Sequence, residues 1–346
     1  MKRHATARRV ITRCLPVGLA VVVLTALVPM ASALAQQAQQ ATLVTDHAWP
    51  ARPVRMVIPF PPGGGADGAA RLLVAHLSQA LGQPFIVDSK PGGSTLIATT
   101  AVAKAAPDGY TLLMTSGSTF TLQPLLNEKL PFDPDGDFAP VAMLSQFPFH
   151  VVASSTLEVN TLSEAITIAR NKPGEVAYAS NGRGGSVHVG MEYLAHAAGI
   201  RLNHVAYKGF PAAMPDLVAG RVSLILADMG PIAPHVQSGA LKLLAVTSPE
   251  RWPLTPDVPT VAEQGLPGYA LSIWFAVFAP AGTPPAIVER LSRTMQQWLA
   301  TEPARAAYAA IGHAPASGGA DEVRERIAAE RRAFKPILRE AGLLRD

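Results

Sequence analysis

The stretch from Val54 to Leu81 constrains the fold more than any other part of this sequence. A β-branched apolar run ends at Pro59–Pro62, three glycines follow, and an apolar-periodic segment then continues to Leu81. This order predicts a strand, a glycine-rich turn and a helix that begins near Ala66. Glycine lets a ligand approach the main chain closely, and the free N–H groups of a first helical turn favour an anion. We therefore expect an anion to be held at this turn.

The N-terminus has the pattern of a secretory signal peptide. A basic segment precedes an almost wholly apolar run, Leu15–Met30, and Ala33–Ala35 offers a small-residue cleavage site. The apolar run is too short and wrongly flanked for a membrane-spanning helix. The pair Arg8–Arg9 also leaves twin-arginine export open beside the general secretory route. We expect residues 1–35 to be removed, residues 36–48 to form a flexible lead-in, and the protein to be soluble in the periplasm.

Removal of this signal changes the charge of the chain. The signal carries five of the 29 Lys and Arg residues and none of the 25 acidic residues, so 24 basic residues remain against 25 acidic ones. The formal charge becomes −1 rather than +4, which gives no support for nucleic-acid binding. Cys14, the only cysteine, also leaves with the signal, so neither a disulfide nor a thiolate metal site is available. We expect no nucleic-acid partner, no metal and no cofactor.

Downstream of the lead-in, short apolar strands alternate with helical stretches. This alternation predicts an α/β fold with parallel-rich sheets, helices on both faces, and ligands at the carboxyl ends of the strands. Phe147–Ser154 and Leu271–Pro280 have the length of strands that cross between two units. We therefore predict two lobes joined by a hinge, with the ligand cleft between them: residues 49–147 plus 271–346 form lobe I, and residues 148–270 form lobe II.

The first turn also satisfies the G-x-G-x-x-G pattern of dinucleotide-binding sites. Gly63–Gly68 fits the spacing, and Asp88 follows at the distance expected for an acidic residue that binds a ribose. Pro61–Pro62 separates these glycines from the strand, whereas that motif requires its first glycine at the strand end. A plain turn in which Asp67 caps the helix, without a ligand, is a second alternative. Capture of a carboxylate or phosphate is the interpretation that we favour.

A second turn of the same kind lies at Ser180–His188. It is small and donor-rich, and it follows a predicted strand and precedes a predicted helix. Two such turns that face each other across a cleft would hold a small anion from both sides. Ser180, Ser186, His188 and Asp228 also have the residue types of a hydrolytic triad, but the chain has no G-x-S-x-G motif. Asp228 is otherwise expected to cap a helix or to accept a hydrogen bond from the ligand.

His188, Glu192 and His196 recur at four-residue spacing on one predicted helix, which raises the possibility of a metal site. Three residues at this spacing drift around the helix, and no H-E-x-x-H motif is present. We expect His188 to point into the cleft and the other two side chains to cover a surface. Lys208 follows a predicted strand and either supplies positive charge to the ligand or faces solvent.

Several motifs occur in an order that resembles the Bug/TctC family. They are P-F-P-P-G-G-G-x-D at Pro59–Asp67, A-x-P-D-G-Y-T-L-L at Ala105–Leu113, Y-A-S-N-G-x-G-G-S-x-H at Tyr178–His188 and D-V-P-T-V-A-E-Q-G at Asp257–Gly265. No single motif is decisive, but the ordered set covers almost the whole mature chain. Members of this family are extracytoplasmic solute receptors of tripartite tricarboxylate transporters.

The resemblance implies a type II periplasmic-binding fold whose two lobes close on a small organic carboxylate. It also implies a receptor that is not an enzyme and that has membrane transport subunits as partners; we expect a monomer. In this family the backbone N–H groups of the first turn largely hold the carboxylate. Carried over position by position, the implied ligand-binding residues are Phe60, Gly63, Gly64, Gly65, Ala66, Asp67, Ser118 and Thr119 in lobe I, and Ser180, Gly182, Gly184, Ser186, His188, Lys208, Gly209 and Asp228 in lobe II.

Two positions depart from the family pattern. Ser89–Thr95 replaces a longer glycine run, so the contribution of that loop to the pocket is open. Arg183 stands where a small or amide residue is more usual, and we include it among the candidate ligand-binding residues. Its guanidinium either takes a second carboxylate in a forked geometry or faces solvent. The first case favours a di- or tricarboxylate over a monocarboxylate.

Two alternatives to a transport receptor stay open. An exported α/β enzyme, either nicotinamide-dependent or hydrolytic, would show turnover or a bound nucleotide. A sensory binding protein would pass its ligand signal to a membrane kinase, and nothing in the sequence separates it from a transport receptor.

Overall fold

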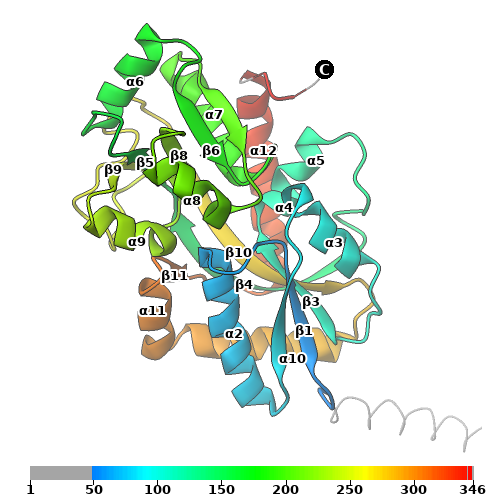
Figure 1. The fold of residues 1–346 in the computed structure, drawn as a ribbon. Coiled ribbons are helices and arrows are strands. Elements are labelled where there is room, and N and C mark those ends of the chain that lie inside the picture. The colour runs from blue at the N-terminus through cyan, green and yellow to red at the C-terminus, as the bar shows by residue number, and fades with distance from the viewer. Residues whose placement is uncertain (1–48, 341, 345–346) are drawn as a thin grey trace, which may run out of the picture. The chain divides into compact units, whose positions relative to one another are not determined.

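Two β-sheets organise the described part of the chain, and the chain passes between them twice (Figure 1). The computed structural model describes residues 49–340 and 342–344; the predicted signal peptide and lead-in lie outside the described residues. Both sheets belong to one unit, residues 50–346. They confirm the predicted α/β fold with two lobes. Lobe I and lobe II are used below for the halves built on the first and the second sheet, and the residue boundaries predicted for them remain predictions.

The first sheet consists of β1 (Val54–Ile58), β2 (Phe85–Ser89), β3 (Thr111–Ser116), β4 (Phe138–Pro148), β10 (Ser272–Pro280) and β11 (Ala314–Pro315). The strand order is β11-β4-β10-β3-β1-β2. β1 pairs in parallel with β2 and β3, whereas β10 runs antiparallel to β3 and β4. The sheet is therefore mixed. Its antiparallel pairs involve β4 and β10, which connect the lobes, and the edge strand β11.

The helices of lobe I are α2 (Gly65–Leu81), η1 (Gly93–Thr95), α3 (Leu96–Ala103), α4 (Ser118–Thr121), α5 (Gln123–Leu126), α10 (Pro285–Leu299), α11 (Glu302–Ala309) and α12 (Ala320–Glu340). The sequence predicts one helix over Thr119–Leu126, but the structure has α4 and α5 instead. Pro124 has no N–H to continue the helical ladder. The carbonyl of Phe120 accepts a hydrogen bond from Arg331 Nε, at 2.8 Å. The proline therefore divides the predicted helix.

The second sheet consists of β5 (His150–Ser154), β6 (Ala177–Ser180), β7 (Asn203–Ala206), β8 (Leu224–Ala227) and β9 (Leu241–Val246), in the order β7-β6-β8-β5-β9. β6 pairs in parallel with β7 and β8, and β5 runs antiparallel to β8 and β9. Its helices are α6 (Leu162–Asn171), α7 (Ser186–Ala198), α8 (Phe210–Val218) and α9 (Met229–Gln237). The spacing of Thr161 and Glu164 predicts a capping box, and the structure has one at the start of α6. The sequence analysis did not predict α9, because Pro231 and Pro234 hide its pattern.

The two connections between the lobes lie side by side. β4 leads into β5 with Phe149 alone between them, and β10 pairs with β4 from Ser272 opposite Pro148 to Pro280 opposite Phe138. Phe149 N donates to Thr247 Oγ1 (2.9 Å), and Thr247 Oγ1 donates to Leu271 O (2.7 Å). The first connection is thus two strands rather than one strand over Phe147–Ser154, because Phe149 between them bonds Thr247. These bonds tie both connections together where a hinge is expected.

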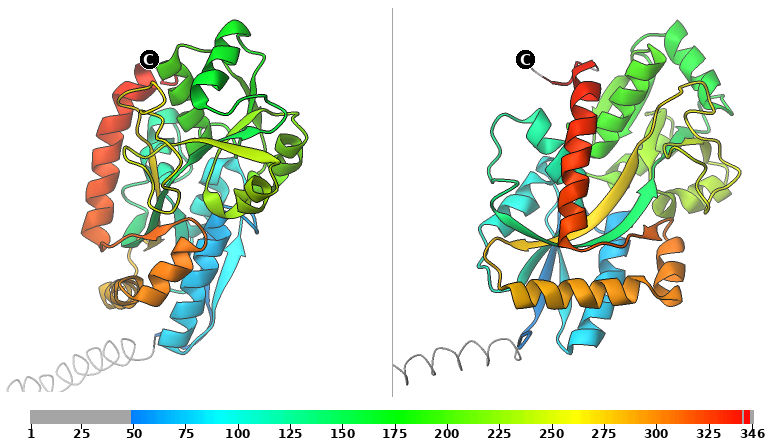
Figure 2. Two further views of the ribbon diagram at one scale, coloured as in Figure 1. Left: turned by 90° about the vertical axis from the view of Figure 1, so that its left-hand side faces the viewer. Right: turned by 180° about the vertical axis from the view of Figure 1, so that it is seen from behind.

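α12 supports both lobes (Figure 2). It packs on β4, and its residue Glu330 accepts a hydrogen bond from Trp274 Nε1 at 2.6 Å. Near its end, the buried Leu338 packs in a cluster with Leu122 of lobe I and Val189 of lobe II. The C-terminal helix therefore connects the lobes outside the two strand connections.

Candidate functional site

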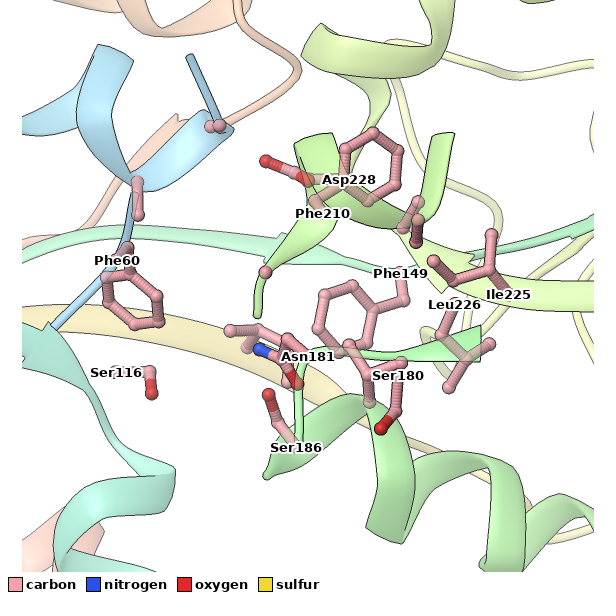
Figure 3. A pocket seen from close by; sticks show the side chains of 18 of the residues that line it. Phe60, Ser116, Phe149, Ser180, Asn181, Ser186, Phe210, Ile225, Leu226 and Asp228 are labelled. Atoms are coloured by element: carbon pink, nitrogen blue, oxygen red, sulfur yellow. The ribbon is translucent and has the colours of Figure 1, made fainter. Parts of the chain in front are cut away.

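Both predicted glycine turns lie at the carboxyl ends of strands and lead into helices. β1 leads into α2 with Gly64 as N-cap, and β6 leads into α7 with Gly185 as N-cap. In neither helix does the side chain of the N-cap residue accept a hydrogen bond from the first turn. The first N–H groups of both helices can therefore donate to a ligand. The N-terminal turns of both helices line the same cavity (Figure 3). Two donor-rich helix ends at one cavity suit an anion.

This cavity, called the aromatic cavity below, has a volume of about 690 Å³ including its open mouth. Phenylalanine rings and aliphatic side chains from both lobes form most of its wall, and the two turns form the rest. The lining residues are Phe60, Pro61, Gly64, Gly65, Ala66, Ser116, Phe147, Phe149, Ser180, Asn181, Ser186, Val187, Gly209, Phe210, Pro211, Ala213, Ile225, Leu226, Ala227, Asp228, Ile273 and Phe275.

A second cavity adjoins the first and is called the polar cavity below. Its volume is about 1040 Å³ including its open mouth, and it contains Arg183, Lys208 and the loop Pro91–Thr95. That loop, whose role the sequence left open, therefore takes part in the cleft. The residues common to both cavities are Phe60, Pro61, Ser116, Asn181, Ser186 and Gly209.

The wall between the cavities carries neutral polar groups. Ser116 Oγ lies 2.7 Å from Ser118 Oγ. Asn181 Oδ1 is buried and has no hydrogen-bond partner among the described residues. A buried polar atom without a partner is uncommon in a native structure. Together with Ser186 at the start of α7, this wall offers hydroxyl and amide groups to a ligand without a fixed positive charge.

Asp228 reaches from lobe II to the first turn of lobe I. Its Oδ2 lies 3.6 Å from Nε2 of the fully buried His313, and the carboxylate accepts no hydrogen bond from any described residue. His313 stacks on Phe147 with ring centres 3.9 Å apart. A Cβ at Gly65 would lie 1.5 Å from Asp228 Oδ2. A side chain at position 65 would therefore require the Asp228 carboxylate to move away from the first turn.

Further contacts join the lobes at the polar cavity. Ser94 Oγ donates to Arg183 O at 2.5 Å, and Gln123 Nε2 donates to Gly184 O at 3.0 Å. A Cβ at Gly209 would lie 2.5 Å from Cγ of Pro61. The structure thus shows the lobes closed against each other around the two cavities.

The predicted ligand-binding residues fall into three groups in the structure. Those that line the aromatic cavity are Phe60, Gly64, Gly65, Ala66, Ser180, Ser186, Gly209 and Asp228; those that line only the polar cavity are Ser118, Gly182, Arg183 and Lys208; those that line neither are Gly63, Asp67, Thr119, Gly184 and His188.

Two residues of the third group, Asp67 and Thr119, make hydrogen bonds within lobe I. Asp67 is buried, and its Oδ2 accepts from Gly63 N at 3.1 Å and from Arg71 Nε at 2.9 Å. Thr119 Oγ1 lies 2.7 Å from Thr115 Oγ1 and donates to Thr95 Oγ1 at 3.0 Å. The hydrogen bonds of both side chains therefore lie inside lobe I rather than at the aromatic cavity, while Asp67 Oδ1 is buried without a partner among the described residues.

His188 does not point into either cavity, contrary to the sequence-based expectation. Its Nδ1 accepts from Gly184 N at 3.2 Å, and its ring centre lies 4.3 Å from that of His204. Burial, with smaller contributions from His204 and Arg183, lowers the pKa of His188 to about 4. Glu192 accepts a hydrogen bond from Tyr178 Oη at 2.5 Å rather than covering a surface. Within the described residues, no group of His, Cys, Asp and Glu side chains could hold a metal ion.

The sequence analysis missed most of the apolar wall. Phe147, Phe149 and Phe275 belong to the two connections between the lobes, and Phe210 follows the second-lobe turn at Gly209. In the sequence these rings have the pattern of ordinary core residues. Ser116 could have been found, because it ends β3 at the edge of the sheet where ligands bind.

A known family profile covers most of the chain. The profile described as "Tripartite tricarboxylate transporter family receptor" (TctC) matches residues 69–343. The chain belongs to this family. Protein BugT of Bordetella pertussis is 38% identical over 300 residues, which cover 86% of this chain and 92% of that protein. The resemblance seen in the ordered motifs is confirmed.

Solved structures of receptors extend the comparison. An R. palustris protein solved with adipate superposes with a TM-score of 0.83 at 34% identity, covering 85% of this chain and 98% of that chain. MatC from Rhodopseudomonas palustris, solved with bound malate, gives a TM-score of 0.78 at 30% identity, covering 84% of this chain and 100% of that one. These neighbours confirm the two-lobed periplasmic-binding fold. Among the described residues, no helix is both long enough and apolar enough to span a membrane.

Proposed function

We propose that this protein is a periplasmic receptor that captures a small organic carboxylate between its lobes and delivers it to membrane transport subunits. The observation that carries the proposal is the pair of helices α2 and α7, whose uncapped N-terminal turns line one cavity from opposite lobes. Their N–H groups and positive dipole ends favour an anion. Similar structures contain adipate and malate, which are carboxylates. No catalytic step is part of this proposal.

The binding residues in this proposal are those that line the aromatic cavity and its shared wall. The first-turn residues Gly64, Gly65 and Ala66 would act through their backbone N–H groups, and Ser186 would act from the opposite lobe. Neutral donors hold an anion without a salt bridge that would slow its release. Closure would then present a surface to the transport subunits, with the ligand shifting the population toward the closed form.

A thermal-shift screen of the purified protein against mono-, di- and tricarboxylates tests the proposal. A ligand at 100 times its dissociation constant adds about 2.7 kcal/mol to the free energy of unfolding, which raises the melting temperature visibly. We expect a shift with at least one class of carboxylic acid and no shift with NAD. A shift with NAD and none with any acid would contradict the proposal and support the dinucleotide alternative at Gly63–Gly68.

A further inference from the structure

The lining of the aromatic cavity suits the apolar part of a ligand. Phe60, Phe147, Phe149, Phe210 and Phe275 all line it. Phe275 contacts Phe147 and Phe60 with ring centres 5.3 and 5.7 Å apart, so three of these rings form a continuous surface. Figure 3 shows Phe60, Phe149 and Phe210 around the same space, with Ile225 and Leu226 on one side. Such a wall gains free energy by removing apolar ligand surface from water.

The same wall lacks positive charge. Asp228 is the one ionisable side chain among the residues that line the aromatic cavity, and it is an acid. His150, which lies close enough to interact with Asp228, is buried, and burial lowers its pKa to about 4. It is therefore uncharged at neutral pH. Arg183 and Lys208 line only the polar cavity.

A second carboxylate in this cavity would consequently have no cation to pair with. Burial of a charge without a partner is strongly unfavourable. The cavity can bind one carboxylate. The turns of α2 and α7, together with Ser116, Asn181 and Ser186, supply hydrogen-bond donors for it.

We infer that the ligand of this receptor is a monocarboxylic acid with an apolar aromatic or short aliphatic body, rather than a di- or tricarboxylate. This inference rests on the proposed function, since it assigns the ligand class of the same site. The carboxylate lies at the turns of α2 and α7, and the apolar body lies among the phenylalanine rings. The exposed Arg183 stays outside the aromatic cavity and pairs with no second carboxylate there.

Two pairs of acids test the inference by calorimetry on the purified protein. Hexanoate and adipate share a six-carbon chain, and benzoate and terephthalate share a ring, so each pair differs by a carboxylate at the far end. We expect at least one monoacid to bind, and to bind about tenfold or more tightly than its diacid partner, which corresponds to about 1.4 kcal/mol.

A substitution of one phenylalanine of the aromatic cavity tests whether the rings bind the apolar body of the ligand. It separates this effect from a general effect of ligand charge. Phe210→Ser removes a ring from the cavity, and we expect it to weaken monoacid binding about tenfold, within the usual range for loss of a buried apolar side chain. Leu254→Ser is the matched control, because Leu254 is 42% exposed and lines neither cavity. We expect this control to leave both affinities unchanged, with the melting temperature of each variant measured beside them.

The outcomes distinguish this inference from the proposed function. Adipate or terephthalate binding as tightly as its monoacid partner would overturn the inference and leave a carboxylate receptor standing. An unchanged monoacid affinity in Phe210→Ser would also overturn it. If adipate, malate, citrate and the monoacids all fail to bind, the proposed function fails, and the inference fails with it.

Discussion

The two glycine turns of the cleft have the same local pattern but are held in different ways. The β1–α2 turn is closed within lobe I, where the buried Asp67 accepts hydrogen bonds from Gly63 N and from Arg71. The β6–α7 turn has bonds within lobe II, from Gly182 N to Ser180 Oγ and from Gly184 N to His188 Nδ1. It also bonds the other lobe, because Arg183 O and Gly184 O accept from Ser94 and Gln123. The first turn is therefore ready before the lobes close, whereas the second is completed by closure.

This difference suggests an order of events in binding. A preformed turn can take the carboxylate in the open form, since its donors do not depend on lobe II. The second turn then adds its donors as Ser94 and Gln123 reach it, so that closure and binding favour each other. Changes at the first turn should affect stability or block closure, and changes at the second should affect affinity.

The largest expected effect comes from Gly65→Ala. The new Cβ would lie 1.5 Å from Asp228 Oδ2, so the Asp228 carboxylate would have to leave its place against the first turn. We expect ligand affinity to fall by about a hundredfold, or ~2.7 kcal/mol, measured by calorimetry with whichever acid binds the unmodified protein.

Gly68→Ala is the matched control for this change. Gly68 lies in α2 but lines neither cavity, and a Cβ there would come no closer than 3.7 Å to Cγ2 of Ile311. The affinity of this variant should stay within about threefold of the unmodified protein. The double variant Gly65→Ala with Asp228→Gly removes the clash and should recover part of the loss. Equal losses for Gly68→Ala and Gly65→Ala would contradict the steric explanation.

A pair of variants compares the supports of the two turns. Asp67→Ala removes the acceptor of Gly63 N, and we expect the free energy of unfolding to fall by about 2 kcal/mol because a buried polar contact is lost. Gln123→Ala removes a contact that exists between lobes, so it should weaken affinity several-fold with less than about 1 kcal/mol of destabilisation. Denaturant unfolding and calorimetry on both variants measure the two effects; the reverse assignment would sink the proposed order of closure.

The second turn is also expected to respond to acid. The folded-state pKa of His188 is lowered to about 4 from an ordinary 6.5, so the unfolded chain binds this proton first as the pH falls. The stability contributed by neutral His188 is therefore complete above about pH 6.5 and is lost progressively down to about pH 4. Protonation also removes the Nδ1 acceptor of Gly184 N.

Melting temperatures between pH 7 and pH 4 measure this effect. We expect the decline in His188→Gln to be shallower than in the unmodified protein, because glutamine does not titrate in this range. His196→Gln, on the same helix, is the control and should keep the original slope. Parallel curves for the unmodified protein and His188→Gln would show that this histidine does not carry the acid sensitivity.

The two turns also show how far the sequence determines the site. Each turn is a local pattern of strand end, glycines and helix start, so its backbone could be predicted without knowledge of the fold. The role of Asp67 could not, because an acid in a first helical turn has the same pattern whether it faces a ligand or closes the turn. The order of strands and helices was predictable for the same reason, while Pro231 and Pro234 concealed α9.

The aromatic cavity lies beyond such local prediction. Phe147 and Phe149 lie far from Phe275 in the chain, and these rings meet because β4 pairs with β10. His313 reaches Asp228 from a loop close to the C-terminus. Whether a phenylalanine faces a core or a cavity depends on these tertiary contacts, which periodicity does not contain.

The smallest expected effect comes from Arg71→Ala. This variant distinguishes the bond between Asp67 and Arg71 from the bond between Asp67 and Gly63 N. Arg71 donates to Asp67 Oδ2, but its side chain is 60% exposed, whereas that of Asp67 is 7% exposed. An exposed ion pair contributes roughly 0.2–1 kcal/mol, because solvent screens the charges and the long side chain loses entropy. Arg71→Ala should therefore lower the free energy of unfolding by under about 1 kcal/mol and leave affinity unchanged. A loss as large as that of Asp67→Ala would mean that the ion pair, and not the buried bond to Gly63 N, holds the turn that makes the first lobe ready for its ligand.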